Sequence, residues 1–553
     1  MKNVRNVLLP LIFSLILIAG ILIGNWYSNH YYGQSLSLKH IFGKKSSSGF
    51  HGNTGNTSLL PSNNKLNSII SYISSEYVDS ISVDALTEST IPSILEELDP
   101  HSVYIPARDL SKYNEPLVGN FSGIGIQFNL VDDSVAVINT IPNGPSEIVG
   151  LFAGDRIVKV NGRTVAGVKL PTDSIVALLR GPKGSTVKVS VMRRNEKDLL
   201  DFEIIRNDIP LYSVDVAYMI SEKTGYIKIS TFAQTTFDEF VEAVEKLHAS
   251  GMNKLILDLR SNGGGIMDAA TSIADQFLDD NKLIVYTQGK ARARYDVFST
   301  SGGICNNDEV CILIDEFSAS ASEILAGAIQ DNDRGTIIGR RSFGKGLVQE
   351  QIQFRDGSAM RLTIARYYTP TGRSIQKPYT DNKSDYYSDL NIRYEHGEFE
   401  NADSIKFSDS LRFVTPGGKT VYGGGGIMPD IFVPMDTTGI SPYFNRVRNL
   451  GVIYRFAFDY SDKNREKLLK YQTSSELSAY LDKTNFYSEF LKYSEVKGIS
   501  PVATDLRLSE NLIRVQLKAY IARNTLDNEG FYPIIQEIDN TLLKAIEVIE
   551  AEN

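Results

Sequence analysis

SASASEI, residues 318–324, joins an apolar run typical of a buried strand, residues 310–314, to a helical pattern over residues 322–330. A serine placed where a buried strand turns into a helix projects its hydroxyl from the edge of the sheet. The helix N-terminus then stabilises the negative charge that forms when the hydroxyl attacks a carbonyl. The stretch therefore predicts a nucleophilic serine. Ser318 lies nearer the strand, and Ser322 is better placed to cap or enter the helix. These positions narrow the choice of the nucleophile among the three serines without settling it.

The base that would activate this serine is not a nearby histidine. The chain has 6 histidines, and none lies between His248 and His396. A Ser-His-Asp triad drawn from neighbouring sequence is therefore disfavoured, and a lysine becomes the candidate, as in Ser-Lys hydrolases. Lys345 stands between two glycines, with Phe343 and Leu347 close by. Such an apolar setting lowers a lysine pKa from its ordinary value of about 10.4, whereas the common alternative is a solvated surface lysine.

Strand and helix patterns alternate from Tyr226 to Leu347. The run 254–259 is continuously apolar up to Asp258, as expected for a strand buried on both faces, and the triplet Gly263–Gly265 ends it. A helix is expected over 268–277, and further strands are expected at 283–286, 310–314 and 336–339. The pattern predicts an α/β core of βαβ units around a largely parallel sheet.

The preceding segment, Phe121 to about Ile209, has short alternating strands instead. Strands are expected at 135–138, 156–160 and 185–193, with a helix over 173–179. Asn161-Gly162 is a strong hairpin signal. These features predict a compact, partly open barrel.

The two ends of the chain differ in character. Lys2 and Arg5 precede an apolar stretch, Val7–Trp26, about long enough to span a bilayer of ~30 Å, with the positive charges on the cytoplasmic side. A cleaved signal peptide is the alternative, but Gly24–Tyr27 lacks a small-x-small cleavage pattern. Two helices are expected between Asn64 and Leu98, and the chain beyond Pro434 is polar and mostly helical.

Composition excludes several classes of function. The chain has 553 residues, which predicts roughly two to four domains. Its net charge of -9 argues against nucleic acid as a partner. The two cysteines, Cys305 and Cys311, form no disulfide framework and no metal pattern, and Cys311 is expected to be a buried strand residue. We expect no cofactor and no metal.

Seven motifs in one order make the chain resemble the C-terminal processing peptidases, also called tail-specific proteases, with an embedded PDZ domain. The resemblance covers about Asp99 to Pro434. The motifs are DPHSVY (99–104), FSGIG (121–125), DLRSNGG (258–264), SASASEI (318–324), FGKG (343–346), YTPTGR (368–373) and GIMPD (426–430).

The resemblance implies roles for individual residues. Ser320 matches the nucleophile and Lys345 the general base, while Gln349 matches the position that orients the lysine amine; in a helix Lys345 and Gln349 would share a face. The oxyanion donors are then the backbone N–H groups of Ala321 and Gly264. Successive backbone N–H groups of Gly123, Ile124, Gly125 and Ile126 would bind the C-terminal carboxylate of a substrate.

The implied fold is α/β, with a crotonase/ClpP-like protease core of βαβ units, an inserted PDZ domain, an N-terminal helical segment and a C-terminal helical tail. The expected parts are listed in chain order: membrane anchor or signal segment 1–27, flexible linker 28–63, N-terminal helical part 64–104, PDZ domain 105–208, peptidase core 209–436 and a helical region of unknown role, 437–553.

The implied function is a serine endopeptidase that recognises and cleaves the C-terminal tails of extracytoplasmic proteins, anchored to the inner membrane on the periplasmic side. The resemblance also implies that an activator protein or homo-oligomer aligns the dyad. A non-catalytic PDZ scaffold is the alternative, although both Ser320 and Lys345 are present. A crotonase-type acyl-CoA enzyme is a third reading, which would need neither these residues nor a PDZ domain.

Overall fold

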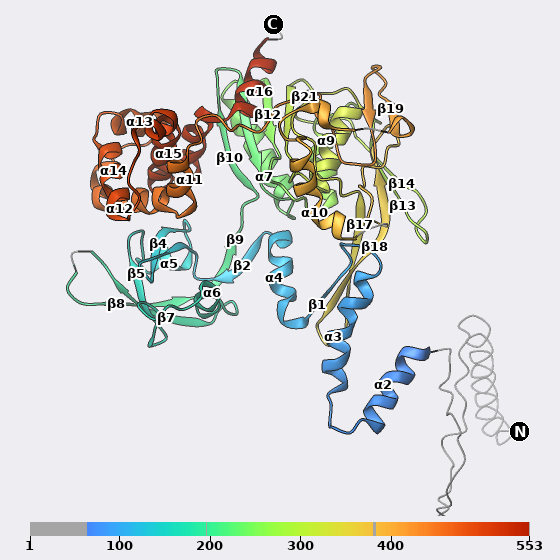
Figure 1. Cartoon of the computed structure of the whole chain (residues 1–553), viewed down its shortest axis with the longest axis horizontal. Coiled ribbons are helices and arrows are strands. Elements are labelled where there is room, and N and C mark those ends of the chain that lie inside the picture. Colours follow the sequence, from blue (N-terminus) through green and yellow to red (C-terminus); the bar gives the residue numbers. More distant parts are fainter. Residues whose placement is uncertain (1–63, 195, 380–382, 407, 552–553) are drawn as a thin grey trace, which may run out of the picture. The chain divides into compact units, whose positions relative to one another are not determined.

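The computed structural model of the chain describes residues 64–551, with the exception of 195, 380–382 and 407 (Figure 1). The chain divides into two units, with the boundary between Val83 and Asp84. The predicted anchor (1–27) and linker (28–63) lie outside the described residues. In the part that is described, no helix combines the length and the apolar character needed to cross a membrane.

Helices dominate the beginning of the described chain, as the spacing of apolar residues predicts. The first unit contains α2 (Lys65–Glu76), and α3 (Val83–Glu96) starts at the boundary between the units. The prediction of two helices between Asn64 and Leu98 is confirmed. Strand β1 (Val103–Ile105) and helix α4 (Ala107–Val118) follow.

A small antiparallel sheet with two short helices occupies the segment predicted as a barrel. Its strand order is β3-β4-β5-β7-β8, β6 pairs with β5, and β2 pairs separately with β9. Asn161 and Gly162 form the turn between β5 and β6, with φ of 48° and 79°, so the predicted hairpin is confirmed. The elements are β2 (Asn120–Gly123), β3 (Ile126–Val131), β4 (Ser134–Thr140), α5 (Pro145–Ile148), β5 (Arg156–Val160), β6 (Arg163–Thr164), α6 (Thr172–Leu179), β7 (Thr186–Met192), β8 (Leu200–Ile205) and β9 (Asn207–Pro210).

The second half of the unit is built on a six-stranded sheet. The strand order is β10-β11-β12-β15-β16-β21, and every neighbouring pair is parallel except β10 with β11. This confirms the predicted parallel βαβ core. The elements are β10 (Val214–Met219), β11 (Thr224–Ile229), α7 (Thr236–Ala249), β12 (Lys254–Asp258), α8 (Met267–Asp275), β15 (Glu309–Ile314), α9 (Ala321–Asp331), β16 (Thr336–Gly339) and β21 (Ile431–Phe432).

Strand β12 shows why its sequence is a continuous apolar run. Leu255 and Leu257 point into the core shared with α7, α8 and α9, whereas Ile256 points into the core on the opposite face. All five residues of β12 are buried. A strand covered on both faces carries apolar side chains on both of them, and the usual alternation disappears over Leu255–Leu257.

A second sheet is antiparallel and corrects one prediction. The run 283–286 was expected in the parallel sheet, but β13 (Leu283–Gln288) lies in a separate sheet of order β1-β18-β13-β14, with β17 paired to β18. The short connection after β13 returns the chain as β14 (Tyr295–Phe298), antiparallel to it. A hairpin partner thus replaces the crossover that a parallel strand needs. The other strands of this sheet are β17 (Leu347–Gln353) and β18 (Ala359–Tyr368).

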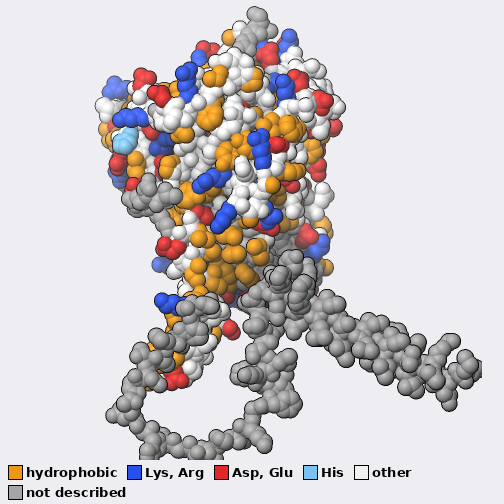
Figure 2. Space-filling model, turned by 90° about the vertical axis from the view of Figure 1, so that its right-hand side faces the viewer, with side chains coloured by type: hydrophobic (Ala, Val, Ile, Leu, Met, Phe, Trp, Pro, Cys, Tyr) orange, Lys and Arg blue, Asp and Glu red, His pale blue; other side chains and the backbone are white. Residues whose placement is uncertain are grey.

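Figure 2 shows apolar side chains gathered on the face that lies on the side of β17 and β18 in Figure 1. Large hydrophobic residues that are exposed in α3, in the second sheet and directly after these elements are Ile94, Leu98, Val103, Ile352 and Phe354.

Between β18 and β21 lies an insert of α10 (Lys383–Glu395), η3 (Ala402–Ser404), η4 (Asp409–Leu411), β19 (Arg412–Val414) and β20 (Thr420–Tyr422). The tail itself is helical, as predicted, with α11 (Pro442–Asn449), α12 (Val452–Leu468), α13 (Ser474–Leu481), α14 (Phe486–Val496), α15 (Ala503–Ile535), η5 (Gln536–Ile538) and α16 (Asn540–Ala551).

The tail has an apolar core of its own in spite of its polar sequence. Helices α11 to α15 supply it, with Phe456, Phe486 and Phe490 among its buried residues. The last helix, α16, packs elsewhere, because its Leu542 and Ile549 share a core with the parallel sheet. The tail therefore contacts the sheet through α16 and through the end of α15, whose Asn528 and Tyr532 donate to Asp215 in β10.

Candidate active site

Ser320 is the residue immediately before α9, at the junction that the sequence singles out. Its φ of 55° and ψ of -112° lie outside the regions that non-glycine residues prefer. Its side chain is partly exposed, and the helix N-terminus lies directly behind it. Strained backbone of this kind is common where a side chain is held ready for reaction.

The two neighbouring serines have structural roles. Ser318 is fully buried, and its hydroxyl bonds the carbonyl of Leu259 at 2.8 Å. Ser322 is also buried and donates to the carbonyl of Asn262 at 2.9 Å. Both hydroxyls are thus committed to the loop after β12, which leaves Ser320 as the serine that faces open space.

Lys345 lies just before β17, and its amine donates to Oε1 of Gln349 at 3.1 Å. The predicted contact is present, but the helix that would explain it is not. Gln349 is in β17, where a register shift next to Val348 interrupts the regular ladder. The Gln349 amide in turn donates to the carbonyl of His101 at 2.5 Å, so its oxygen is held toward the lysine.

The surroundings of Lys345 favour its neutral form. Burial lowers the pKa of the Lys345 amine, Glu323 opposes that shift, and the Arg361 guanidinium adds to it. The nearby His101 imidazole bonds the Tyr386 hydroxyl at 2.5 Å. Burial, with a contribution from Lys345, lowers the pKa of His101 to about 4, so the imidazole is neutral near pH 7.

Ser320 and Lys345 line one cleft of about 690 Å³. Gly264, Ala321 and Gln349, which sequence reasoning assigned to the same site, also line it. Among the residues that the structure describes, no hydrogen bond joins the Ser320 hydroxyl to the Lys345 amine. The fold therefore brings the predicted catalytic residues together, but their roles remain predictions.

Glu323 is a component of the site that sequence reasoning missed. Its carboxylate is fully buried and accepts the backbone N–H groups of Ser320 at 2.8 Å and Lys345 at 2.9 Å. It also accepts the Ser342 hydroxyl at 2.5 Å and the Gly344 N–H at 2.7 Å. Burial raises the pKa of this carboxyl, and the four donors work against that shift. The spacing Ser-x-x-Glu at a helix start is a capping signature that could have revealed it.

Tyr367, in β18, is a second missed residue. Its hydroxyl lies 3.0 Å from the carbonyl oxygen of Ser320 and 2.6 Å from that of Lys345. The ring is buried, which raises the pKa of the phenol. Glu323 and Tyr367 therefore tie the serine segment to the lysine segment from two sides. No local pattern marks Tyr367.

The two predicted oxyanion donors differ in availability. Within the described part of the chain no hydrogen bond takes the N–H of Ala321, so it is free to face a substrate oxygen. The N–H of Gly264, by contrast, donates to the Asn262 side chain at 2.9 Å. Gly264 packs closely on the nucleophile, because a Cβ atom added there would lie 2.7 Å from that of Ser320. The second donor remains a prediction that requires Gly264 to release Asn262.

Asp331 is an acidic residue at the far end of α9. It is buried and pairs with Arg373 at 2.6 Å. It bonds Thr371 as well. This residue stabilises the fold around YTPTGR and is no part of the cleft.

The PDZ-like segment has a groove of its own between β3 and α6. Ile124, Gly125 and Ile126 line it, together with Val176 and Leu179 on the helix. Gly123, the fourth predicted donor, lies at the end of β2 and pairs with Asn207. No hydrogen bond among the described residues takes the N–H of Ile124 or Gly125. These two groups are therefore available for a carboxylate.

Comparisons with known proteins agree with this arrangement. Residues 223–384 match peptidase family S41, residues 122–204 match the PDZ domain, and residues 443–527 match a family of unknown function (DUF8443). The boundaries predicted for the individual parts stay predictions.

Two relatives and two solved structures illustrate the likeness. A carboxy-terminal-processing protease of Bartonella bacilliformis is 35% identical over 56% of this chain and 71% of its own length. A probable CtpA-like serine protease of Staphylococcus aureus is 33% identical over 62% of this chain and 69% of its own. The photosystem II D1 C-terminal processing protease is 29% identical and covers 55% of this chain and 81% of its own, with a TM-score of 0.33. The PDZ domain of a Vibrio cholerae carboxy-terminal protease, solved with a peptide, is 31% identical over 17% of this chain and 99% of its own, with a TM-score of 0.16.

The family matches and the two curated relatives define a serine-type peptidase with a PDZ domain, and the fold adds a C-terminal helical region. The chain belongs to peptidase family S41, among the carboxy-terminal-processing serine proteases.

Proposed function

We propose that the chain is a serine endopeptidase whose nucleophile is Ser320 and whose general base is neutral Lys345. One observation carries the proposal: Glu323 binds the backbone of both residues beside the same cleft. A buried carboxylate with donors from both segments fixes their separation, which is what a two-residue mechanism needs.

In the first step the Ser320 hydroxyl attacks the scissile carbonyl carbon. Its proton passes to the Lys345 amine, which burial favours in the neutral form. The negative charge on the carbonyl oxygen is stabilised by the free N–H of Ala321 and by the positive end of α9, with Gly264 as the second donor.

In the second step the protonated Lys345 returns its proton to the leaving amine, and the C–N bond breaks to give an acyl-enzyme. A water molecule then attacks the ester, with Lys345 again as the base, and releases the new carboxyl end. Gln349, held by the His101 carbonyl, orients the amine through both steps.

The PDZ domain supplies substrate recognition in this proposal. The groove offers two free backbone N–H groups for a terminal carboxylate and the apolar side chains Ile124, Val176 and Leu179 beside them. A peptide with a free C-terminus and an apolar last residue fits these features, with its backbone added to the edge of β3.

We also propose where in the cell the peptidase is located. Lys2 and Arg5 before the apolar run favour an anchor that keeps the peptidase on the extracytoplasmic side of the inner membrane, in the cell envelope. No hydrogen bond joins the Ser320 and Lys345 side chains within the described residues. We therefore also propose that an activator protein or a homo-oligomer brings these two side chains together.

The competing function is a PDZ scaffold that binds C-termini without cutting them. Incubation of the chain with a peptide that has a free, apolar C-terminus separates the two. The peptidase cleaves the peptide, and the Ser320→Ala variant binds it with unchanged affinity but does not cleave. Binding without cleavage by the unaltered chain, in the presence of membranes and at all concentrations tried, would favour the scaffold.

A further inference from the structure

Arg260 joins the catalytic half of the molecule to the C-terminal tail. Its guanidinium donates to both oxygens of Asp539, at 2.8 Å and 2.7 Å. Asp539 lies just before α16 and also accepts the N–H groups of Thr541 and Leu542 at its first turn. One carboxylate thus caps the last helix and binds the arginine of the DLRSNGG motif.

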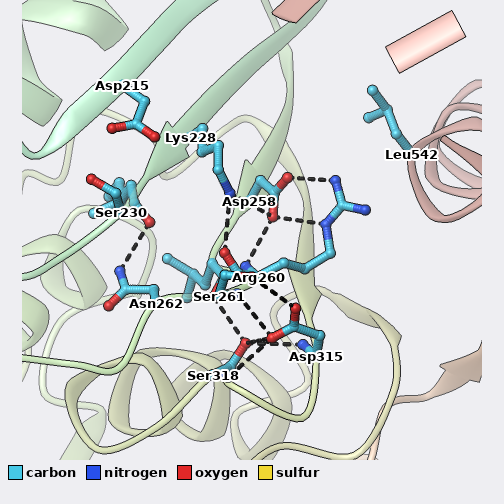
Figure 3. A network of polar contacts seen from close by, with 12 residues as sticks. Asp215, Lys228, Ser230, Asp258, Arg260, Ser261, Asn262, Asp315, Ser318 and Leu542 are labelled. Atoms are coloured by element: carbon cyan, nitrogen blue, oxygen red, sulfur yellow. Dashed lines mark hydrogen bonds and ion pairs between the residues drawn. The ribbon is translucent and has the colours of Figure 1, made fainter. Parts of the chain in front are cut away.

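The same arginine is fixed from its other side by Asp258, at the end of β12. Nε and Nη2 donate to the two Asp258 oxygens, at 2.9 Å and 2.5 Å, and Lys228 donates to the Arg260 carbonyl at 3.0 Å (Figure 3). Burial would raise the pKa of the Asp258 carboxyl, but Arg260 and Lys228 hold it below its ordinary value. Arg260 therefore sits between two carboxylates in a defined orientation.

Arg260 also forms the base of the loop that reaches the nucleophile. The next residue, Ser261, has a φ of 60° and is held by Asp315, which accepts its N–H at 2.9 Å (Figure 3). The carbonyl of Asn262 accepts the Ala319 N–H at 3.0 Å and the Ser322 hydroxyl at 2.9 Å. These two residues flank Ser320, and Gly264 packs against Ser320 itself. The backbone from Arg260 to Gly264 and the polar contacts along it thus link Asp539 to the segment that carries the nucleophile.

Apolar side chains also hold α16 on the sheet. Leu542, Ala545 and Ile549 of this helix are buried against the sheet in a shared apolar core. That burial is the main source of binding between the two parts. The ion pair of Arg260 with Asp539 fixes the orientation of the Arg260 side chain more than it attaches α16, because a planar guanidinium bound at three nitrogens has one allowed orientation.

We propose that Asp539 is a positioning residue for peptide-bond cleavage: through Arg260 it holds the loop 261–265 against Ser320, so that the C-terminal tail sets the turnover rate without touching the substrate. This inference rests on the proposed function. It gives a role to the end of the tail, which carries no chemistry of its own.

Two variants separate positioning from simple attachment of the tail. Asp539→Asn removes the charge that binds Arg260 but keeps an oxygen to cap α16. The matched control is Lys254→Met, at the opposite end of the same strand β12. Lys254 also links this strand to α16, by donating to the Ile549 carbonyl at 2.6 Å, but lies away from the catalytic loop.

The experiment measures kcat and KM for a quenched fluorescent peptide with a free C-terminus, and the thermal unfolding midpoint of each full-length variant. We expect Asp539→Asn to lower kcat at least tenfold, with KM within about twofold of the original value and an unfolding midpoint close to that of Lys254→Met. Lys254→Met should keep its kcat. An equal loss of kcat in both variants, or no loss in Asp539→Asn, overturns the inference.

A third variant, Arg260→Lys, tests the same contact from the other side. It keeps the charge but cannot bind two carboxylates in a fork. Because it breaks the contact that Asp539→Asn breaks, the two losses in kcat should not multiply in the double variant; losses that do multiply count against the inference. An unaltered chain that neither cleaves the peptide nor reacts at Ser320 defeats the proposed function instead, and the inference with it.

Discussion

Glu323 accepts the backbone N–H of Lys345 at 2.9 Å through an oxygen that also accepts the N–H of Ser320. The nucleophile and the base therefore depend on one buried side chain for their relative position. The hydrogen bonds that the Glu323 carboxylate accepts from these two residues come from their backbone N–H groups, so its role is to position the backbone.

Replacing Glu323 by Gln tests this role. The amide keeps the size of the side chain but has one acceptor oxygen in place of two, and its NH2 group would face backbone donors. We expect the free energy of unfolding to fall by about 2–4 kcal/mol and kcat to fall with it, measured by denaturant unfolding and by peptide cleavage. Glu245→Gln, on the exposed side of α7, is the control and should change neither. A fully active, fully stable Glu323→Gln protein would contradict the role.

Replacing Gln349 by Glu tests the protonation state of Lys345. The added carboxylate favours the charged lysine and raises its pKa, by about 1–3 units for a close partner. Activity that needs the neutral amine should then fall at pH 7 and recover as the pH rises, so the pH profile of kcat/KM moves to higher pH. Gln353→Glu, on the exposed end of the same strand, should leave the profile unchanged. A profile that moves to lower pH, or not at all, argues against lysine as the base.

Replacing Gly264 by Ala tests the close packing on Ser320, and the neighbouring Gly263 provides the control. A Cβ at Gly264 would lie 2.7 Å from the Ala319 carbonyl oxygen, and its φ of 98° is unfavourable for alanine. A Cβ at Gly263 would meet nothing within 4 Å. We expect Gly264→Ala to lower kcat by roughly a hundredfold, comparable to the loss of an oxyanion donor, and Gly263→Ala to remain active. Similar kinetics in both variants would show that the close packing on Ser320 does not matter.

Amidation of the substrate's C-terminus tests recognition by the PDZ groove. It removes the charge and one acceptor oxygen without altering the scissile bond. Hydrogen bonds to a charged group contribute roughly 1.5–3 kcal/mol, so kcat/KM should fall about ten- to a hundredfold. A higher KM with unchanged kcat indicates that the PDZ groove only tethers the substrate. A lower kcat as well indicates that tail binding aligns the dyad. Equal cleavage of free and amidated peptides would reject tail recognition and leave Ser320 and Lys345 untouched.

Short-range patterns predicted much of this fold. The apolar run of β12, the helix after Ser320 and the turn at Asn161 follow from neighbouring residues, and the structure confirms them. The position of β13 did not follow, because an apolar run does not reveal which strand will pair with it. The parallel arrangement expected for it was wrong.

The parts of the site that sequence reasoning missed depend on long-range contacts. Tyr367 reaches Lys345 from the next strand, and the His101 carbonyl fixes Gln349 from a segment far earlier in the chain. No local spacing encodes such contacts. Gln349 itself was found through the family's pattern, but the helix that would have explained its contact is a strand.

The most direct test of the central claim is the rate at which a fluorophosphonate labels the protein as a function of pH, with the modified residue mapped by mass spectrometry. The account predicts a single adduct on Ser320. Its rate should rise with pH through a lysine pKa below the ordinary value, since burial disfavours the charged amine. Lys345→Arg, which stays protonated, should not react. An adduct on Ser318 or Ser322, or labelling of Lys345→Arg at the unaltered rate, would contradict the claim that Ser320 and Lys345 perform the reaction.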